Sequence, residues 1–248
     1  MNVNAPRRVQ LFVTCLIDTL RSEAGMAVVR VLEALDIAVE FPNAQTCCGQ
    51  PAFNGGAWDD ARAMGRHTLD VLAKSDAPIV VPSGSCGAML VHHYPELFAG
   101  DAKYGPLAEN IAARTYEFSQ FLVEVLGVTA LNARLDERIA YHPSCHLLRG
   151  MNIVNPPRAL LANIRDAELV ELDGAEECCG FGGLFAIKMD AISSAMMQRK
   201  LDAIQAAQVQ TLVSCDVSCL LHLSGGLHRR GSRVKTKHLA EILDPQQA

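Results

Sequence analysis

Residues 177–185 read Glu-Cys-Cys-Gly-Phe-Gly-Gly-Leu-Phe, and the same Cys-Cys-Gly triplet occurs earlier in the chain as Cys47-Cys48-Gly49. Other cysteines recur at nearly the same interval, because Cys15 is followed by Cys145 and Cys86 is followed by Cys219. A repeat of this kind indicates two copies of one structural unit. We therefore interpret the chain as an internal duplication.

Each copy alternates strand and helix patterns. In the first copy we expect strands at 9–13, 37–41 and 78–81, with helices at 24–35 and 57–73. In the second copy we expect strands at 138–141, 169–172 and 211–214, with helices at 157–164 and 190–207. Strands that alternate with helices predict parallel sheets covered by helices on their faces.

The predicted fold class is therefore α/β, with two duplicated, Rossmann-like, three-layer halves. We place the first repeat at residues 1–105 and the second repeat at residues 138–248. Residues 106–137 are expected to link them, with an extra helix over residues 106–126. At 248 residues the chain is long enough for each half to bury its own core.

The cysteine groups each follow the predicted end of a strand. In sheets of this type, ligands bind beyond the carboxyl ends of the strands. We therefore expect two convergent sites, one per half. The first would gather Cys15, Cys47, Cys48 and Cys86, and the second would gather Cys145, Cys178, Cys179, Cys215 and Cys219.

Composition restricts the function classes. A net charge of -5 argues against a nucleic-acid-binding protein, which is usually basic. The first fifteen residues lack the apolar run of a signal peptide, and no stretch approaches the length of a membrane span. We therefore expect a cytoplasmic protein that does not insert into a membrane. Thiols stay reduced in the cytosol, so nine cysteines do not predict a disulfide scaffold.

Converging thiolates are soft ligands that select zinc, copper(I) or iron–sulfur clusters. Structural zinc usually binds Cys-x-x-Cys pairs, whereas adjacent cysteines suit different irons of a larger cluster. Glycines after each pair (Gly49, Gly180, Gly182, Gly183) allow backbone N–H groups to approach the sulfurs. Iron–sulfur binding is favoured on these grounds. A zinc site, a redox dithiol and plain buried cysteines remain as alternatives.

The order Cys15, Cys47-Cys48-Gly49, Cys86 resembles the cysteine-rich CCG domain, which occurs twice in a heterodisulfide reductase subunit and in the glycolate oxidase iron–sulfur subunit. Four stretches look more specifically like the lactate-utilization protein A family. They are Pro82-Ser-Gly-Ser-Cys86-Gly-Ala-Met89, His92-His93-Tyr94-Pro95-Glu96-Leu97, Tyr141-His-Pro-Ser-Cys145-His146 and Glu177-Cys-Cys-Gly-Phe-Gly-Gly-Leu-Phe185. The resemblance covers nearly the whole chain.

The resemblance implies an iron–sulfur electron-transfer subunit of a three-protein system that oxidises L-lactate to pyruvate. Such a chain would be a non-catalytic or co-catalytic subunit of an L-lactate dehydrogenase complex, and no catalytic residue is assigned. Its partners would be the other subunits of the complex, including a ferredoxin-type iron–sulfur protein. The alternative function is a zinc- or thiol-based assembly scaffold without electron transfer.

All nine cysteines are predicted ligands: Cys15, Cys47, Cys48, Cys86, Cys145, Cys178, Cys179, Cys215 and Cys219. The noncubane clusters of the heterodisulfide reductase subunit use five cysteines, and only the second half has five. Pro82 occupies the position that corresponds to Cys215, so the first half has four. We expect a 4Fe–4S cluster, with a noncubane cluster as the alternative for the second half and zinc as the alternative metal. The neighbouring histidines, His92, His93, His142, His146 and His222, are not assigned as ligands.

Overall fold

The computed structural model describes residues 5–247 and contains two four-stranded parallel sheets. Residues 1–4, which belong to the stretch that predicts no signal peptide, lie outside the described residues. The first sheet has the order β2-β1-β3-β4 and the second has the order β6-β5-β7-β8. The strands are β1 (Arg8–Leu11), β2 (Ala38–Glu40), β3 (Ile79–Val81), β4 (Thr115–Glu117), β5 (Arg138–His142), β6 (Glu168–Val170), β7 (Thr211–Ser214) and β8 (Lys235–His238).

The strand register supports the duplication. In the first sheet Gln10 lies opposite Ile79, and in the second sheet Ala140 lies opposite Leu212. The interval from Gln10 to Ala140 equals the interval from Cys15 to Cys145. The prediction of an α/β fold with two equivalent parallel halves is confirmed.

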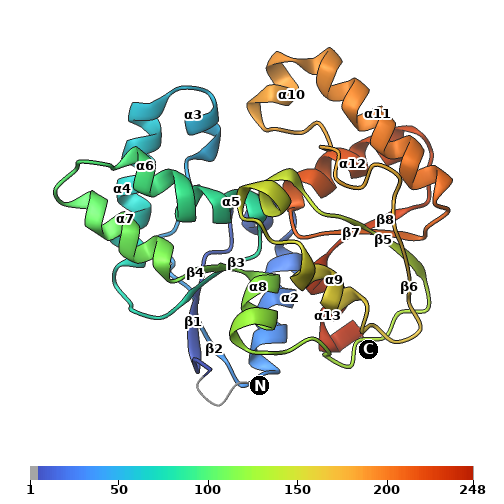
Figure 1. Ribbon diagram of the computed structural model, residues 1–248, viewed down its shortest axis with the longest axis horizontal. Coiled ribbons are helices and arrows are strands. Elements are labelled where there is room, and N and C mark those ends of the chain that lie inside the picture. Colours follow the sequence, from blue (N-terminus) through green and yellow to red (C-terminus); the bar gives the residue numbers. More distant parts are fainter. Residues whose placement is uncertain (1–4, 248) are drawn as a thin grey trace.

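Helices surround both sheets (Figure 1). In the first half they are α1 (Cys15–Leu20), α2 (Ser22–Glu33), α3 (Gln50–Asn54), α4 (Trp58–Leu72), α5 (Gly84–Ala88), η1 (Met89–His93), α6 (Tyr94–Leu97), α7 (Tyr104–Ala113), α8 (Phe118–Gln120) and η2 (Phe121–Val125). In the second half they are η3 (His146–Gly150), α9 (Asn155–Leu161), α10 (Leu184–Lys188), α11 (Asp190–Ala206), α12 (Val217–Arg229), α13 (Leu239–Leu243) and η4 (Pro245–Gln247). No helix within residues 5–247 is long and apolar enough to cross a bilayer.

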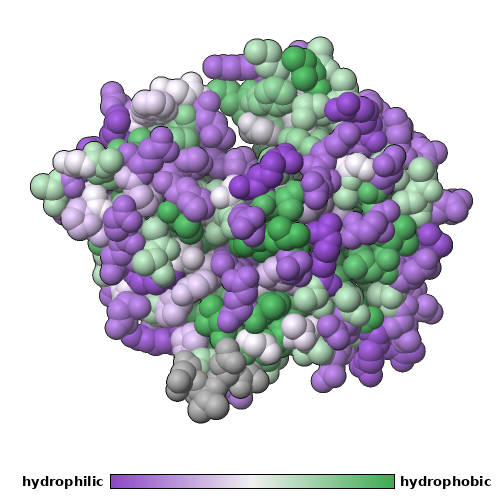
Figure 2. Space-filling view, viewed as in Figure 1, coloured by the Kyte–Doolittle hydropathy of each residue, from purple (hydrophilic) through white to green (hydrophobic). Residues whose placement is uncertain are grey.

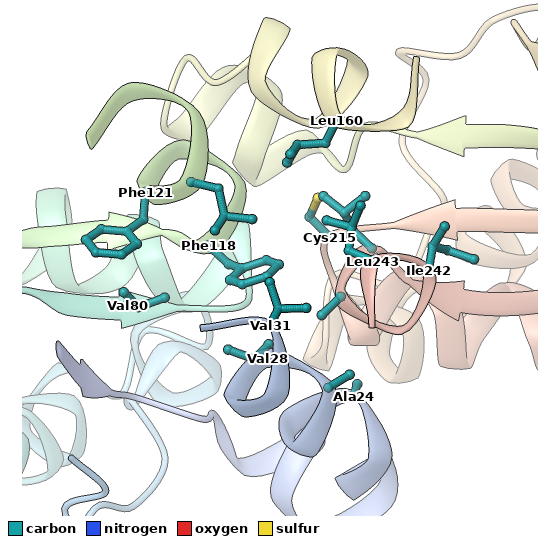
Figure 3. Close-up of a cluster of buried hydrophobic side chains, with 14 of the residues drawn as sticks. Ala24, Val28, Val31, Val80, Phe118, Phe121, Leu160, Cys215, Ile242 and Leu243 are labelled. Carbon is teal, nitrogen blue, oxygen red and sulfur yellow. The ribbon is translucent and has the colours of Figure 1, made fainter. Parts of the chain in front are cut away.

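One hydrophobic core is shared by the two halves. Helix α2 packs against α13, and α8 packs against α9, so that helices of both halves meet between the sheets. Figure 3 shows Val28 and Phe118 of the first half beside Leu160 and Leu243 of the second half. Burial of apolar side chains is the main stabilising contribution to such contacts, so the halves form one unit.

Each half also has a core of its own on the outer face of its sheet. Alternate residues of β3 divide between the two cores, because successive strand residues point to opposite faces. Val80 belongs to the shared core, whereas Ile79 and Val81 belong to the outer core of the first half. In β7, Val213 belongs to the shared core and Leu212 to the outer core of the second half.

The segment 106–137 differs from the single linking helix that we expected. Helix α7 ends at Ala113, and the next residues form β4, which pairs with β3 in the first sheet. Strand β8 has the equivalent place in the second sheet. Both strands are short and contain polar or charged residues, so neither has the apolar pattern from which a strand is predicted.

Candidate metal centre

Eight of the nine cysteines line one cavity between the two halves, with a volume of about 180 Å³. They are Cys15, Cys47, Cys48, Cys86, Cys145, Cys178, Cys179 and Cys219. The cavity lies between α3 and α10, near the top of the molecule in Figure 1, where the outline in Figure 2 is indented. The sequence predicted two separate convergent sites. The structure has two sets of four cysteines that face the same cavity.

The first set is assembled from three chain segments. Cys15 begins α1 just after β1, the Cys47-Cys48 pair precedes α3, and Cys86 lies in α5 just after β3. The sulfurs of Cys48 and Cys86 are 3.4 Å apart. Cys47 interacts with both Cys15 and Cys48, so the four thiols form a continuous chain of contacts.

The second set repeats this arrangement. The sulfurs of Cys178 and Cys145 are 4.0 Å apart, and Cys179 interacts with both Cys178 and Cys219. Cys145 lies just before η3, and Cys219 lies in the first turn of α12. All nine cysteines within residues 5–247 are free thiols, as expected for ligands rather than disulfides.

Unusual backbone conformations occur at equivalent positions in both sets. Thr14 (φ 73°) and Ser144 (φ 56°) precede the first cysteine of each set in a conformation that non-glycine residues seldom adopt. Gly180 (φ 93°) follows the second Cys-Cys pair, and an added Cβ there would lie 2.5 Å from the backbone oxygen of Ser193. Local strain of this kind often marks functional sites.

Backbone amides donate hydrogen bonds to the sulfurs of the second set. The Gly180 N–H donates to Cys178 Sγ at 3.4 Å, and the Phe181 N–H donates to Cys179 Sγ at 3.5 Å. In the first set the Gly49 N–H donates a hydrogen bond to the sulfur of Cys47. These amides stabilise negative charge on sulfur, which is the form of cysteine that binds metals.

The pKa values within each set diverge because neighbouring thiols share protons. Hydrogen bonds from Cys15 and Cys48 lower the pKa of Cys47 to about 3. Hydrogen bonds from Cys145 and Cys179 lower the pKa of Cys178 to about 2. The partner thiols have raised pKa values for the converse reason. Full deprotonation of either set would bring several negative charges together in a partly buried site, which requires a cation.

Cys215, the ninth predicted ligand, lies elsewhere. It follows β7, on the same face as Val213, and its fully buried thiol belongs to the shared core, as Figure 3 shows. Its sulfur is 3.6 Å from the hydroxyl of Tyr141, and it is not among the residues that line the cavity. The second half therefore brings four cysteines to the cavity, the same number as the first.

One site residue, Asp216, was not recognised from the sequence, and a second, His142, was noted there but not assigned as a ligand. Asp216 lines the cavity and accepts hydrogen bonds from both halves of the protein. His142 is buried, and one of its ring nitrogens lies within 4.8 Å of the sulfurs of Cys179 and Cys219, which are within the same distance of each other. A histidine directly after a predicted strand and shortly before a cysteine was the available signal for the second residue.

The other histidines vary in their relation to the cavity. His146 lines it, with Nδ1 3.8 Å from Cys145 Sγ. His222 packs edge-on against Phe181, with ring centroids 5.8 Å apart. His93 contacts Glu96, and His92 is exposed.

The chemistry of the donor set fits a bound metal group. Each set offers four sulfur donors in mutual contact, with amide donors around them and apolar packing behind. Soft thiolate ligands of this kind suit iron–sulfur clusters or zinc. The arrangement is therefore a candidate metal centre with two related sets of ligands.

Comparisons with known proteins agree with the duplication. The family model described as "Cysteine-rich domain", CCG, matches residues 9–91 and again residues 139–224. Lactate utilization protein A of Macrococcus caseolyticus is 44% identical over 239 residues, covering 96% of this chain and 97% of that protein. The protein of the same name from Geobacillus kaustophilus is 44% identical over 237 residues, covering 96% and 98%.

Among solved structures, glutamate racemase from Francisella tularensis aligns with 97% of this chain and 78% of its own, with a TM-score of 0.40 and 11% identity. That likeness is too low to bear on function. The two family matches span the cysteine-containing segments that form the cavity, and the relatives align over nearly the full chain. The chain therefore belongs to the cysteine-rich CCG domain family and, within it, to the lactate utilization protein A family.

Proposed function

We propose that this chain is an iron–sulfur electron-transfer subunit of a multi-protein system that oxidises L-lactate. The observation that carries the proposal is the gathering of eight cysteines, in two equivalent sets of four, around one cavity. Relatives that are 44% identical over nearly their full length bear the name lactate utilization protein A, which supports the substrate and the multi-protein setting.

The eight cysteines of the cavity would hold the clusters, which exchange one electron at a time when bound. Amides of the Cys-Cys-Gly loops would stabilise the cluster sulfurs. Phe12 and Ala140, on the outer faces of the two sheets, pack behind the cysteines and exclude water. The redox groups that we assign to this chain are these clusters alone, so we place oxidation of lactate itself on a partner subunit in the cytoplasm.

Metal and sulfide analysis after purification without oxygen tests the cluster assignment. We expect a brown protein that contains iron and acid-labile sulfide, with an EPR signal on reduction. Cys48→Ser and Cys179→Ser should each lose the iron of one set and retain that of the other. A colourless protein that contains stoichiometric zinc and no iron would refute the proposal.

A second experiment tests the role in lactate oxidation. The purified chain is mixed, without oxygen, with the other subunits of the system and L-lactate. We expect its visible absorbance to bleach with L-lactate when the partner subunits are present and to remain unchanged without them. Absorbance that does not respond to L-lactate in the complete mixture would separate this chain from lactate oxidation.

Zinc binding in an assembly scaffold is the second candidate. It is favoured by His142 beside Cys179 and Cys219, because zinc accepts mixed nitrogen and sulfur ligands. Iron, sulfide and zinc contents decide between the two candidates. A zinc scaffold would also retain its partners after chemical oxidation and reduction and would show no EPR signal.

A further inference from the structure

His142, the last residue of β5, is a buried imidazole beside two cysteines of the second set. The residue is 1% exposed, neither Nδ1 nor Nε2 makes a hydrogen bond of good geometry within residues 5–247, and the ring interacts with the thiol of Cys219. Buried polar atoms are nearly always paired, because leaving one unpaired costs the desolvation free energy of that atom. One loose thiol contact leaves at least one imidazole nitrogen without a partner, which indicates an additional group at this position.

The surroundings of His142 identify the kind of group. One ring nitrogen and the sulfurs of Cys179 and Cys219 lie within 4.8 Å of one another. Strand alternation places His142 on the same face of the sheet as Ala140, which packs in the outer core with both cysteines. Nitrogen and sulfur donors that converge in a buried space form a metal ligand set.

The equivalent position in the first half has no such donor. Phe12 stands before Cys15 as His142 stands before Cys145, its N–H donates to the Val80 oxygen, and it is fully buried in the core that contains Cys48 and Cys86. Its ring can pack behind a cluster but cannot bind one. The two halves therefore match in their cysteines and differ in this residue.

We propose that His142 supplies an imidazole nitrogen ligand to the metal group of the second set, whereas the first set binds through thiolates alone. The inference rests on the proposed function, because it requires that the two sets hold iron–sulfur clusters. A metal group held by His142 and the two neighbouring sulfurs would account for an unpaired nitrogen of the imidazole without any change in the backbone.

The two centres then differ in reduction potential. An imidazole that takes the place of one thiolate leaves less negative charge on the ligands, and histidine ligation of this kind raises the potential of an iron–sulfur centre. A second difference acts in the same direction. The buried ammonium of Lys200 donates to the carbonyl oxygens of Gly174 and Ala175, and its charge interacts with the Glu177 carboxylate and with Cys179 and Cys178.

The first half lacks a charge at the position that corresponds to Lys200. Met64 and Met196 contact equivalent glycines, and Thr68 follows Met64 by the same interval by which Lys200 follows Met196. We therefore expect the second centre to accept an electron before the first, so that an electron received by this chain comes to rest near His142.

Pulsed EPR of the intact protein, grown with ¹⁵N-histidine, tests the ligand assignment. The reduced second centre should show the hyperfine coupling of a coordinated histidine nitrogen. His142→Phe, which copies the first half, should abolish the coupling, retain the iron of the second set and lower its potential. His142→Cys should retain the iron, lack the coupling and lower the potential. His222→Phe, the matched control, should leave both the coupling and the iron unchanged.

If His142→Phe fails to fold, the nitrogen coupling and iron content of the native protein still test the inference. Iron and sulfide in both sets without nitrogen coupling would overturn the role of His142 and leave the proposed function standing. A coupling that His222→Phe abolishes and His142→Phe retains would also overturn it. A native protein that takes up no iron would refute the inference together with the proposed function.

Discussion

Ser83 and Asp216 occupy equivalent positions in the two halves, and the Ser83 hydroxyl donates a hydrogen bond of 3.1 Å to Asp216 Oδ2. Each residue caps a helix that contains a cysteine of its own set. Ser83 accepts from the Cys86 N–H in α5, and Asp216 accepts from the Ser218 N–H at the start of α12. The Ser85 N–H also donates to Asp216, so one carboxylate joins both helix starts beside the cavity.

We predict that Asp216→Ala lowers the free energy of unfolding by about 2 kcal/mol, because it removes a helix cap and leaves the Ser83 and Ser85 donors unpaired. Urea unfolding measures the loss.

Metal content of Asp216→Ala should fall in both sets, since Cys86 and Cys219 both lie on the capped segments. Asp101→Ala, which removes a carboxylate that accepts from the Lys103 and Tyr104 amides in a loop of the first half, is the control and should retain the metal. Equal metal loss in both variants would contradict the prediction.

Glu117 gives the protein a pH-dependent stability. Burial raises the pKa of its carboxyl to about 7 from an ordinary value of 4.5, against the opposing hydrogen bonds from Ser119 and Gln120. The folded protein therefore binds this proton more tightly than the unfolded chain does. The resulting stability is present below pH 4.5 and is lost as the pH rises through about 7, with a total effect of about 3 kcal/mol.

Glu117→Gln should flatten the decrease in unfolding free energy between about pH 5 and pH 8, because an amide accepts the same amide hydrogen bonds without titrating. Urea unfolding at several pH values measures the slope. Glu124→Gln, in an exposed position of the next segment, should keep the slope of the native protein. A native protein whose stability is constant over this range would show that Glu117 does not titrate there.

A substitution of Cys215 tests whether the second half binds its metal group through five cysteines or through four. Because its thiol packs in the shared core beside Tyr141, we predict that Cys215→Ala retains the iron of both sets and loses about 1 kcal/mol of stability. Cys219→Ser should instead lose the iron of the second set. Iron analysis and urea unfolding of the two variants provide the comparison. Loss of iron in Cys215→Ala would favour a five-cysteine site.

Gly180→Ala should destabilise the protein by about 2–4 kcal/mol, since the new Cβ would add left-handed strain and clash with the Ser193 oxygen. The same change should reduce metal binding by the second set, because the Gly180 N–H donates to Cys178.

Gly225→Ala is the matched control for Gly180→Ala. It lies in α12 with nothing within 4 Å of the added Cβ and should stabilise by about 0.5–1 kcal/mol. Thermal unfolding with iron analysis checks both signs, and a stable, iron-replete Gly180→Ala would contradict the role of this loop.

The sequence predicted the main elements well, because they carry strong local patterns. Strands β1 and β7 and helices α2, α4 and α11 lie within a few residues of the predicted ranges. Strands β4 and β8 were missed, because such short runs with polar side chains carry no alternation that could reveal pairing with a distant strand. Residues 115–117 therefore extend the first sheet, although the sequence placed them in a linking helix.

The sequence by itself determined the duplication, the parallel sheets and the convergence of cysteines at the strand ends. Each of these follows from the spacing of the cysteines along the chain and from their position directly after a predicted strand. Only the tertiary structure decided that the two sets share one cavity, because that depends on how the helices between the sheets pack. The tertiary structure also removed Cys215 from the candidate ligands and added His142. Side chains alternate between the two faces of a strand, so Cys215 lies in the shared core and His142 lies beside Cys179. Which residues of a strand face which core depends on the helices that pack on both faces of the sheet.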